Sequence, residues 1–197
     1  LKLLAACSTG AVIGSSLSAC THKKFYNPDE DIYLSGGSYT DGSHIQPALI
    51  TINLTQQEKR VIDTPFLPHD IQIDPEDKMR IVCFEKDADR ACVIDLQTQA
   101  VVASFNSSKG RLFSGHGAFS KDGKNLYSIE SIDADNPDEQ LGSITIRDAK
   151  TLQVIKQLPT LGLKPHDCQL AGEHTLTVSN TGLSASGFHQ PSLVTID

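Results

Sequence analysis

Three histidines occupy the same position in three copies of a repeated pattern, and imidazole is a side chain that changes charge near neutral pH. His69, His116 and His166 each stand at the start of a short strand-like segment, and Asp70 and Asp167 directly follow two of them. Imidazole beside carboxylate suits transition metal ions, and histidine also carries protons. These five residues are therefore the candidate ligand-binding group, with a transition metal ion as the candidate cofactor.

The same position could serve packing instead of binding. A histidine at the start of a strand can hydrogen-bond the backbone of the neighbouring repeat and so hold two repeats together. Identical placement in successive repeats is expected from either use, so the sequence leaves both interpretations open.

The spacing of the repeat predicts the fold. The intervals from His69 to His116 and from His116 to His166 are 47 and 50 residues. A period of about 40–50 residues built from four short strands is typical of a β-propeller blade. In one blade we expect strands near 70–73, 80–84, 91–96 and 100–105. Because the inner strands of all blades run in one direction, the three histidines are predicted to converge at one mouth of the central channel.

The pattern predicts an all-β chain of four-stranded antiparallel blades with no substantial helix. Residues 32–197 account for a partial first blade (about 32–66), two full blades and an unfinished fourth, or about 3.5 blades. Propellers close with about 4–8 blades. We therefore expect about half of a larger ring, with a closed four-bladed ring as the alternative.

The first residues are typical of a targeting segment rather than of a folded element. Residues 3–19 are apolar or small and uncharged, and they end in Leu17-Ser18-Ala19-Cys20, which resembles the bacterial lipobox. Residues 1–20 are thus predicted to be a signal peptide whose Cys20 takes a lipid, with an ordinary signal peptide as the alternative. Residues 1–4 resemble the tail of a twin-arginine signal. Residues 21–31 are expected to be a polar tether.

The charge of the chain restricts its partners. A net charge of −7 argues against nucleic acid and against electrostatic binding to an anionic membrane. The predicted lipid is therefore the expected link to a membrane. Together with the signal peptide, it predicts a periplasmic location, where protein partners are also expected.

Two cysteines flank a tight turn around residues 87–89. Cys83 and Cys92 are expected to lie nearly opposite each other on adjacent strands. In an oxidising compartment they could form a disulfide, and otherwise they would be two small buried side chains.

Three segments together resemble one known family: Phe113–Tyr127, Gly162–Asp167 and Gln190–Asp197. They are similar to the family called domain of unknown function 1513, and the resemblance extends over about residues 32–197. It implies a periplasmic seven-bladed propeller of the lactonase and amine-dehydrogenase type, carrying a twin-arginine signal, of which this chain covers the first half. The family usually has Glu where Asp167 stands. The resemblance implies little chemistry beyond an association of some members with periplasmic iron uptake.

Two kinds of function follow. One is a ligand-binding or scaffold propeller, extended by the resemblance to periplasmic metal or iron handling. The alternative is a lactonase-like or metal-assisted hydrolase, for which Glu130 and Asn180 are candidate ligands. No nucleophile elbow or zinc-protease motif is present, so the sequence favours binding over catalysis. The acidic loop Asp133–Glu139 loosely matches a calcium loop but lacks its glycine and spaced glutamate, which favours a solvated loop.

Overall fold

Segments that alternate between buried and exposed side chains form strands throughout the chain. The computed structural model describes residues 25–27, 29–132, 141–173, 175–184 and 187–197. Within them every regular element is a β-strand, as predicted. No helix there is long and apolar enough to cross a membrane. The signal peptide, Cys20 and the acidic loop Asp133–Glu139 lie outside the described residues.

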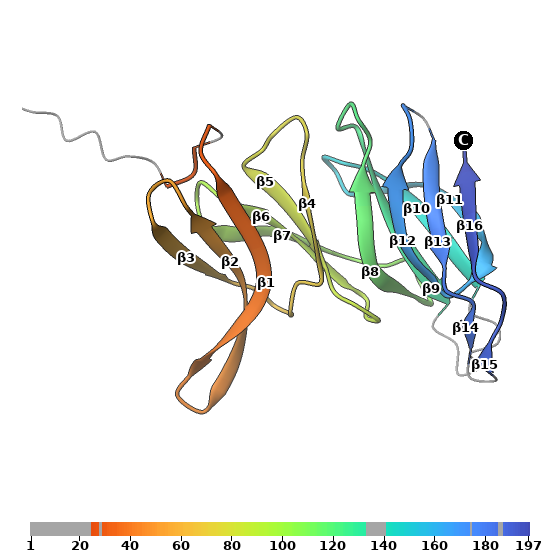
Figure 1. Ribbon diagram of the computed structural model, residues 1–197, viewed down its shortest axis with the longest axis horizontal. Coiled ribbons are helices and arrows are strands. Elements are labelled where there is room, and N and C mark those ends of the chain that lie inside the picture. The colour runs from red at the N-terminus through yellow and green to blue at the C-terminus, as the bar shows by residue number, and fades with distance from the viewer. Residues whose placement is uncertain (1–24, 28, 133–140, 174, 185–186) are drawn as a thin grey trace, which may run out of the picture.

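The described strands form four antiparallel sheets of three or four strands, which follow one another along the molecule (Figure 1), and one two-stranded hairpin. The first has three strands: β1 (Ile32–Asp41), β2 (His44–Asn53) and β3 (Glu58–Asp63). The second has four: β4 (Asp70–Ile73), β5 (Arg80–Phe84), β6 (Arg90–Asp95) and β7 (Ala100–Asn106). The third has four: β8 (Arg111–Phe119), β9 (Asn125–Ile132), β10 (Leu141–Asp148) and β11 (Val154–Leu163).

The fourth sheet has three strands: β12 (Pro165–Leu170), β13 (Leu176–Asn180) and β16 (Ser192–Ile196). A small hairpin, β14 (Leu183–Ser184) with β15 (Gly187–Phe188), is inserted between β13 and β16. The strands predicted for the second blade match β4–β7 to within one residue at each end. The three-, four-, four- and three-stranded sheets therefore confirm a run of propeller blades.

The turns between third and fourth strands repeat one hydrogen-bonded design. Asp95 Oδ1 accepts the N–H of Gln97 (2.7 Å), and Asp148 Oδ1 accepts the N–H of Thr151 (2.7 Å). Each turn also contains a residue with a left-handed backbone conformation, Gln99 with φ 56° or Leu152 with φ 62°. An aspartate that binds the backbone two or three residues on stabilises a tight turn. The repeat is thus visible in local geometry as well as in sequence.

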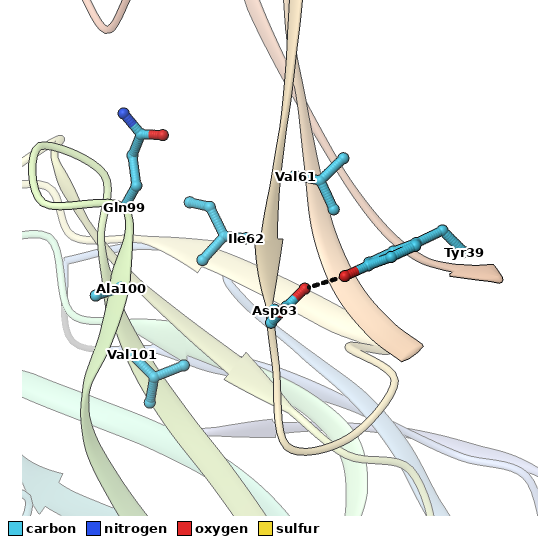
Figure 2. A pocket seen from close by; sticks show the side chains of 7 residues that line it. All are labelled: Tyr39, Val61, Ile62, Asp63, Gln99, Ala100 and Val101. Carbon is cyan, nitrogen blue, oxygen red and sulfur yellow. Dashed lines mark hydrogen bonds between the residues drawn. The ribbon is translucent and has the colours of Figure 1, made fainter. Parts of the chain in front are cut away.

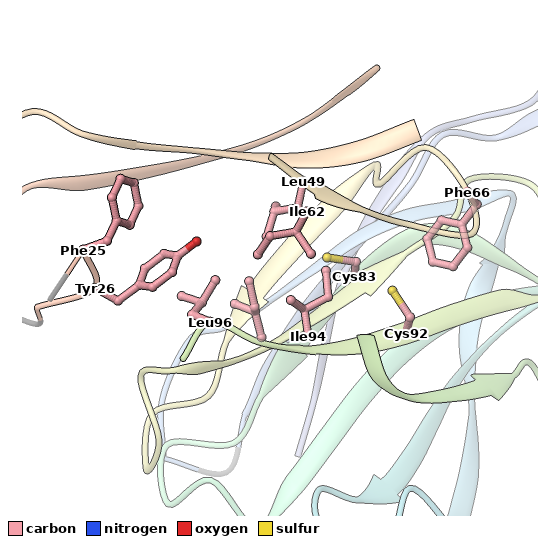
Figure 3. Close-up of a cluster of buried hydrophobic side chains, with 10 residues drawn as sticks. Phe25, Tyr26, Leu49, Ile62, Phe66, Cys83, Cys92, Ile94 and Leu96 are labelled. Carbon is pink, nitrogen blue, oxygen red and sulfur yellow. The ribbon is translucent and has the colours of Figure 1, made fainter. Parts of the chain in front are cut away.

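Apolar side chains from neighbouring blades share one core at each junction. Between the second and third blades, the ring of Phe84 packs edge-to-face on Phe105 and Phe113, with centroids 6.2 and 5.4 Å apart. Between the first and second blades, buried residues of β2, β3, β5 and β6 meet (Figure 3). Because the second sheet has a buried apolar core on each face, it is stabilised by both of its neighbours.

The segment before β1 differs from the expected tether. Phe25 and Tyr26 are 3% and 7% exposed and join the core between the first and second blades. The Tyr26 hydroxyl hydrogen-bonds Thr51 Oγ1 (3.0 Å), and Asn53 Nδ2 donates to the backbone oxygen of Phe25 (2.7 Å). A tether through residues 21–31 therefore does not extend past Phe25, because these two aromatic rings are part of the fold.

Candidate functional site

The three repeated histidines lie together, in or directly beside three neighbouring inner strands. His69 precedes β4, His116 lies in β8 and His166 lies in β12, and β8 packs between the other two strands. The ring centroid of His116 is 4.9 Å from that of His69 and 4.8 Å from that of His166, and both pairs are edge-to-face. The predicted convergence is confirmed. Whether these residues bind a ligand stays a prediction.

Glycines flank the middle histidine because its neighbours leave no room for side chains. Gly115 has φ +100°, and a Cβ there would lie 2.6 Å from Cδ2 of His69. A Cβ on Gly117 would lie 2.6 Å from the ring of Phe84. The Gly-His-Gly copy therefore differs from the two Pro-His-Asp copies for a steric reason, since the rings of His69 and Phe84 fill the space.

Asp70 ties one inner strand to the next. Its Oδ2 accepts the N–H of Gly117 (3.1 Å) and the side-chain amide of Gln72 (2.8 Å), while its Oδ1 accepts the N–H of Ile71 (2.9 Å). A Cβ at Gly117 would instead meet the ring of Phe84 and the backbone oxygen of Tyr127. Asp70 thus contributes to blade packing as well as to the charge of the site.

Asp167 approaches the middle histidine from the following blade. Its Oδ1 lies 3.7 Å from Nδ1 of His116, and its Oδ2 accepts a long bond from Nε2 of Gln169 (3.5 Å). A carboxylate beside one ring nitrogen orients an imidazole. The Nε2 atom of His116 is buried and has no hydrogen-bond partner among the described residues.

A groove of about 950 Å³ runs along the three inner strands. His116, Asp70 and Asp167 line it, whereas His69 and His166 are not among its lining residues. The five predicted residues are therefore close together but divide into two groups. Three face the groove, and two histidines flank His116 at the more exposed mouth.

The groove also contains two amides that sequence reasoning missed as site residues. Gln72 and Gln169 line it, each three positions after a repeated histidine. That common offset was the signal that could have identified them. In the middle blade the equivalent position is Phe119, so the two amides and two carboxylates come from the outer two of the three strands.

Charges in the groove favour cations. Asp70, Asp167 and Glu173 face it with Lys121 as the single cation among its described lining residues. At the mouth, partial burial lowers the pKa of His69 and of His166, and the neighbouring His116 and Lys86 lower it further. The lowered pKa values favour the neutral form of both flanking rings, so these rings contribute little positive charge beside the carboxylates at neutral pH.

The donor set does not form a ready-made metal centre. Among the residues described by the structure, no group of three His, Cys, Asp or Glu side chains is placed to hold a metal ion. One imidazole and several oxygen acceptors are suitable ligand types for a metal ion. Their positions in this structure do not bring three of them together around one point.

The candidates of the hydrolase hypothesis have structural roles. Glu130 is fully buried, its Oε1 lies 2.9 Å from Arg147, and its Oε2 accepts the N–H of Ser108 (3.0 Å). Asn180 is buried and donates to the backbone oxygen of Thr160 (3.2 Å). Neither lines the groove, so both residues support blade packing.

A second, separate cavity of about 530 Å³ lies between the outer strands of the first two blades (Figure 2). Tyr39 reaches across from β1 and donates its hydroxyl to Asp63 Oδ1 (2.8 Å). Ile62 points from β3 toward the side of Ala100 and Val101, whereas Val61 points to the Tyr39 side of the strand (Figure 2). None of the repeated histidines contributes to this cavity.

Solved structures show the same fold at low sequence identity. Hydrazine synthase from Kuenenia stuttgartiensis matches with a TM-score of 0.63 and 17% identity, covering 95% of this chain and 49% of its own. A gluconolactonase from Xanthomonas campestris matches with a TM-score of 0.52 and 12% identity, covering 80% and 47%. The β-propeller domain of a trilobed protease from Pyrococcus furiosus matches with a TM-score of 0.51 and 14% identity, covering 84% and 50%.

These likenesses concern the fold alone. The chain spans about half the length of each of those solved structures. No curated protein matches the sequence. The family described as protein of unknown function (DUF1513) matches residues 62–190, which include all three repeated histidines. The chain therefore belongs to the DUF1513 family and has the β-propeller fold.

Proposed function

We propose that this chain is the ligand-binding region of an exported propeller and that it binds rather than transforms its ligand. The observation that carries the proposal is the groove at the inner strands, where His116 lies beside Asp167 and across from Asp70. Ligand sites are typically concave and place a few polar groups at fixed positions. The structural roles of Glu130 and Asn180 leave the hydrolase alternative without its candidate residues.

The ligand is a small molecule with positive charge or several hydrogen-bond donors. Carboxylates and side-chain amide oxygens offer acceptors, and Asp70, Asp167 and Glu173 outnumber Lys121. A narrower form of the proposal is metal handling in the periplasm. In that form His116 and one carboxylate would bind a transition metal ion, with further ligands supplied by solvent or by a metal-bound molecule.

A length-matched ligand series tests the charge preference. Calorimetric titration compares 1,4-diaminobutane, 1,4-butanediol and succinate, which have the same carbon length and carry two positive, no, and two negative charges. We expect measurable binding of the diamine and none of succinate. Binding of succinate in preference to the diamine would overturn the proposal.

Titration with Zn²⁺ tests the metal form separately. We expect His116→Gln to weaken Zn²⁺ binding by at least about tenfold, because the amide is a much poorer zinc ligand than imidazole. Equal Zn²⁺ affinity of the two proteins would remove the metal form and leave the diamine result to decide the broader proposal.

Export and anchoring belong to the same proposal. The apolar segment of residues 3–19 and the following Cys20 support a lipid-anchored protein on the periplasmic side, with the propeller held near the membrane. The family resemblance supports a seven-bladed ring of which these blades form one half.

A further inference from the structure

Cys83 and Cys92 are direct partners in the ladder between β5 and β6. The N–H of Glu85 donates to the backbone oxygen of Arg90, and the N–H of Leu96 donates to that of Met79. Hydrogen-bonded pairs recur every second residue, so Cys83 and Cys92 form such a pair. Opposite residues of this kind have Cα atoms about 5.5 Å apart. Disulfides most often join Cα atoms about 5.5–6 Å apart.

Both side chains also point to the same side of the sheet. They are fully buried in the core shared by the first two blades, near Ile62 and Phe66 (Figure 3). Val82 and Phe84, the sequence neighbours of Cys83, face the core on the opposite side. The two thiols are free in this structure. The neighbouring thiol of Cys92, followed by burial, raises the pKa of Cys83.

We propose that Cys83 and Cys92 form a disulfide that closes the β5–β6 hairpin when the chain folds in an oxidising environment. Each thiol gives up one proton and one electron, and one sulfur–sulfur bond forms. An oxidant that carries a disulfide, such as oxidised glutathione, accepts the two electrons and two protons and is released as two thiols. Because the folded core excludes the oxidant and disfavours the thiolate, the bond forms before the core closes.

Peptide mapping tests the bond directly. The full chain is refolded with oxidised and reduced glutathione, its free thiols are alkylated in denaturant, and it is digested with trypsin without reduction. Trypsin cuts after Arg80, Lys86, Arg90 and Lys109, so we expect peptide 81–86 to be linked to peptide 91–109. Cys168 is the internal control, since it is buried in a different core and has no opposite cysteine in the ladder. It should be recovered alkylated.

A stability comparison gives an independent readout. We expect the oxidised wild type to unfold at higher urea concentration than the same protein after reduction. Cys168→Ser should keep this difference and Cys92→Ser should lose it. Recovery of both Cys83 and Cys92 alkylated from folded, oxidised protein would overturn the proposal, as would a link from either residue to Cys168.

Discussion

At the scale of single residues, Glu130 shows how this chain compensates a charge inside a blade. Its carboxylate has no exposed surface and is paired with Arg147, whose guanidinium lies 5.2 Å from the centre of the Phe105 ring. Arg147 also donates to the backbone oxygen of Asn106 (3.1 Å). The pair thereby fixes the connection between the second and third blades to β9 and β10.

Removal of Glu130 should destabilise the fold strongly. Glu130→Ala leaves the buried guanidinium of Arg147 without its counter-charge, and breaking such a pair costs about 3–5 kcal/mol of unfolding free energy. Lys124→Ala is the control, because its ion pair with Asp122 is exposed and worth about 0–1 kcal/mol. Urea denaturation measures both. Similar losses for the two variants would contradict a buried, compensated pair.

The flanking histidines should make stability depend on pH. The pKa values of His69 and His166 are lowered in the folded state, so the unfolded chain binds protons at higher pH than the folded chain does. Stability should therefore fall as the pH drops below about 6.5. The effect is small because both rings are largely exposed. Thermal unfolding at about pH 7.5 and about pH 5.5 should show less change for His69→Gln/His166→Gln than for wild type. An unchanged pH response would contradict the lowered pKa values.

At the scale of strands, Gly115 sets the approach of β8 to the preceding blade. Gly115→Ala should cost about 1–3 kcal/mol more than Gly110→Ala. Both positions have positive φ, but only a Cβ at Gly115 meets other residues, the ring of His69 and Lys86. Urea denaturation measures the difference, and the NMR signals of His69 should shift only in the Gly115 variant. Equal losses would show that the contact of β8 with His69 is not tight.

The repeat allowed most strands to be predicted, because alternation and turn residues are local features. It also allowed the convergence of the three histidines to be predicted, since equal offsets in equivalent strands lead to the same end of the inner strands. The side chains that line the groove could not be predicted in the same way. Whether His69 or His116 faces it depends on ring packing against Gly115, a contact between blades. Burial of Phe25 was missed for the same reason, because its core neighbours are distant in sequence.

At the scale of the whole molecule, the second and third blades each share a core with both neighbours, and the groove lies where three inner strands meet. The proposed binding site and the stability of the fold therefore depend on the same junctions. Asp70 illustrates this coupling, since it both bonds the backbone of the next blade and lines the groove.

The proposed anchor gives a prediction for the whole protein in its host. Cys20→Ala removes the sulfur that would carry the lipid, so the protein should move from the membrane fraction to the soluble periplasmic fraction. Cys7→Ala is the matched control and should remain in the membrane fraction. Cell fractionation followed by immunoblotting measures the distribution. Equal membrane association of the Cys20 variant and wild type would rule out the lipid anchor.

Calorimetric titration of Asp70→Asn/Asp167→Asn with 1,4-diaminobutane tests the central claim most directly. Asparagine keeps an oxygen that can accept the N–H of Gly117, so the blades should remain packed while the groove loses two negative charges. We predict that the variant melts within a few degrees of wild type and binds the diamine at least about tenfold more weakly. Unchanged affinity in a folded variant would contradict a cation-binding groove between these inner strands.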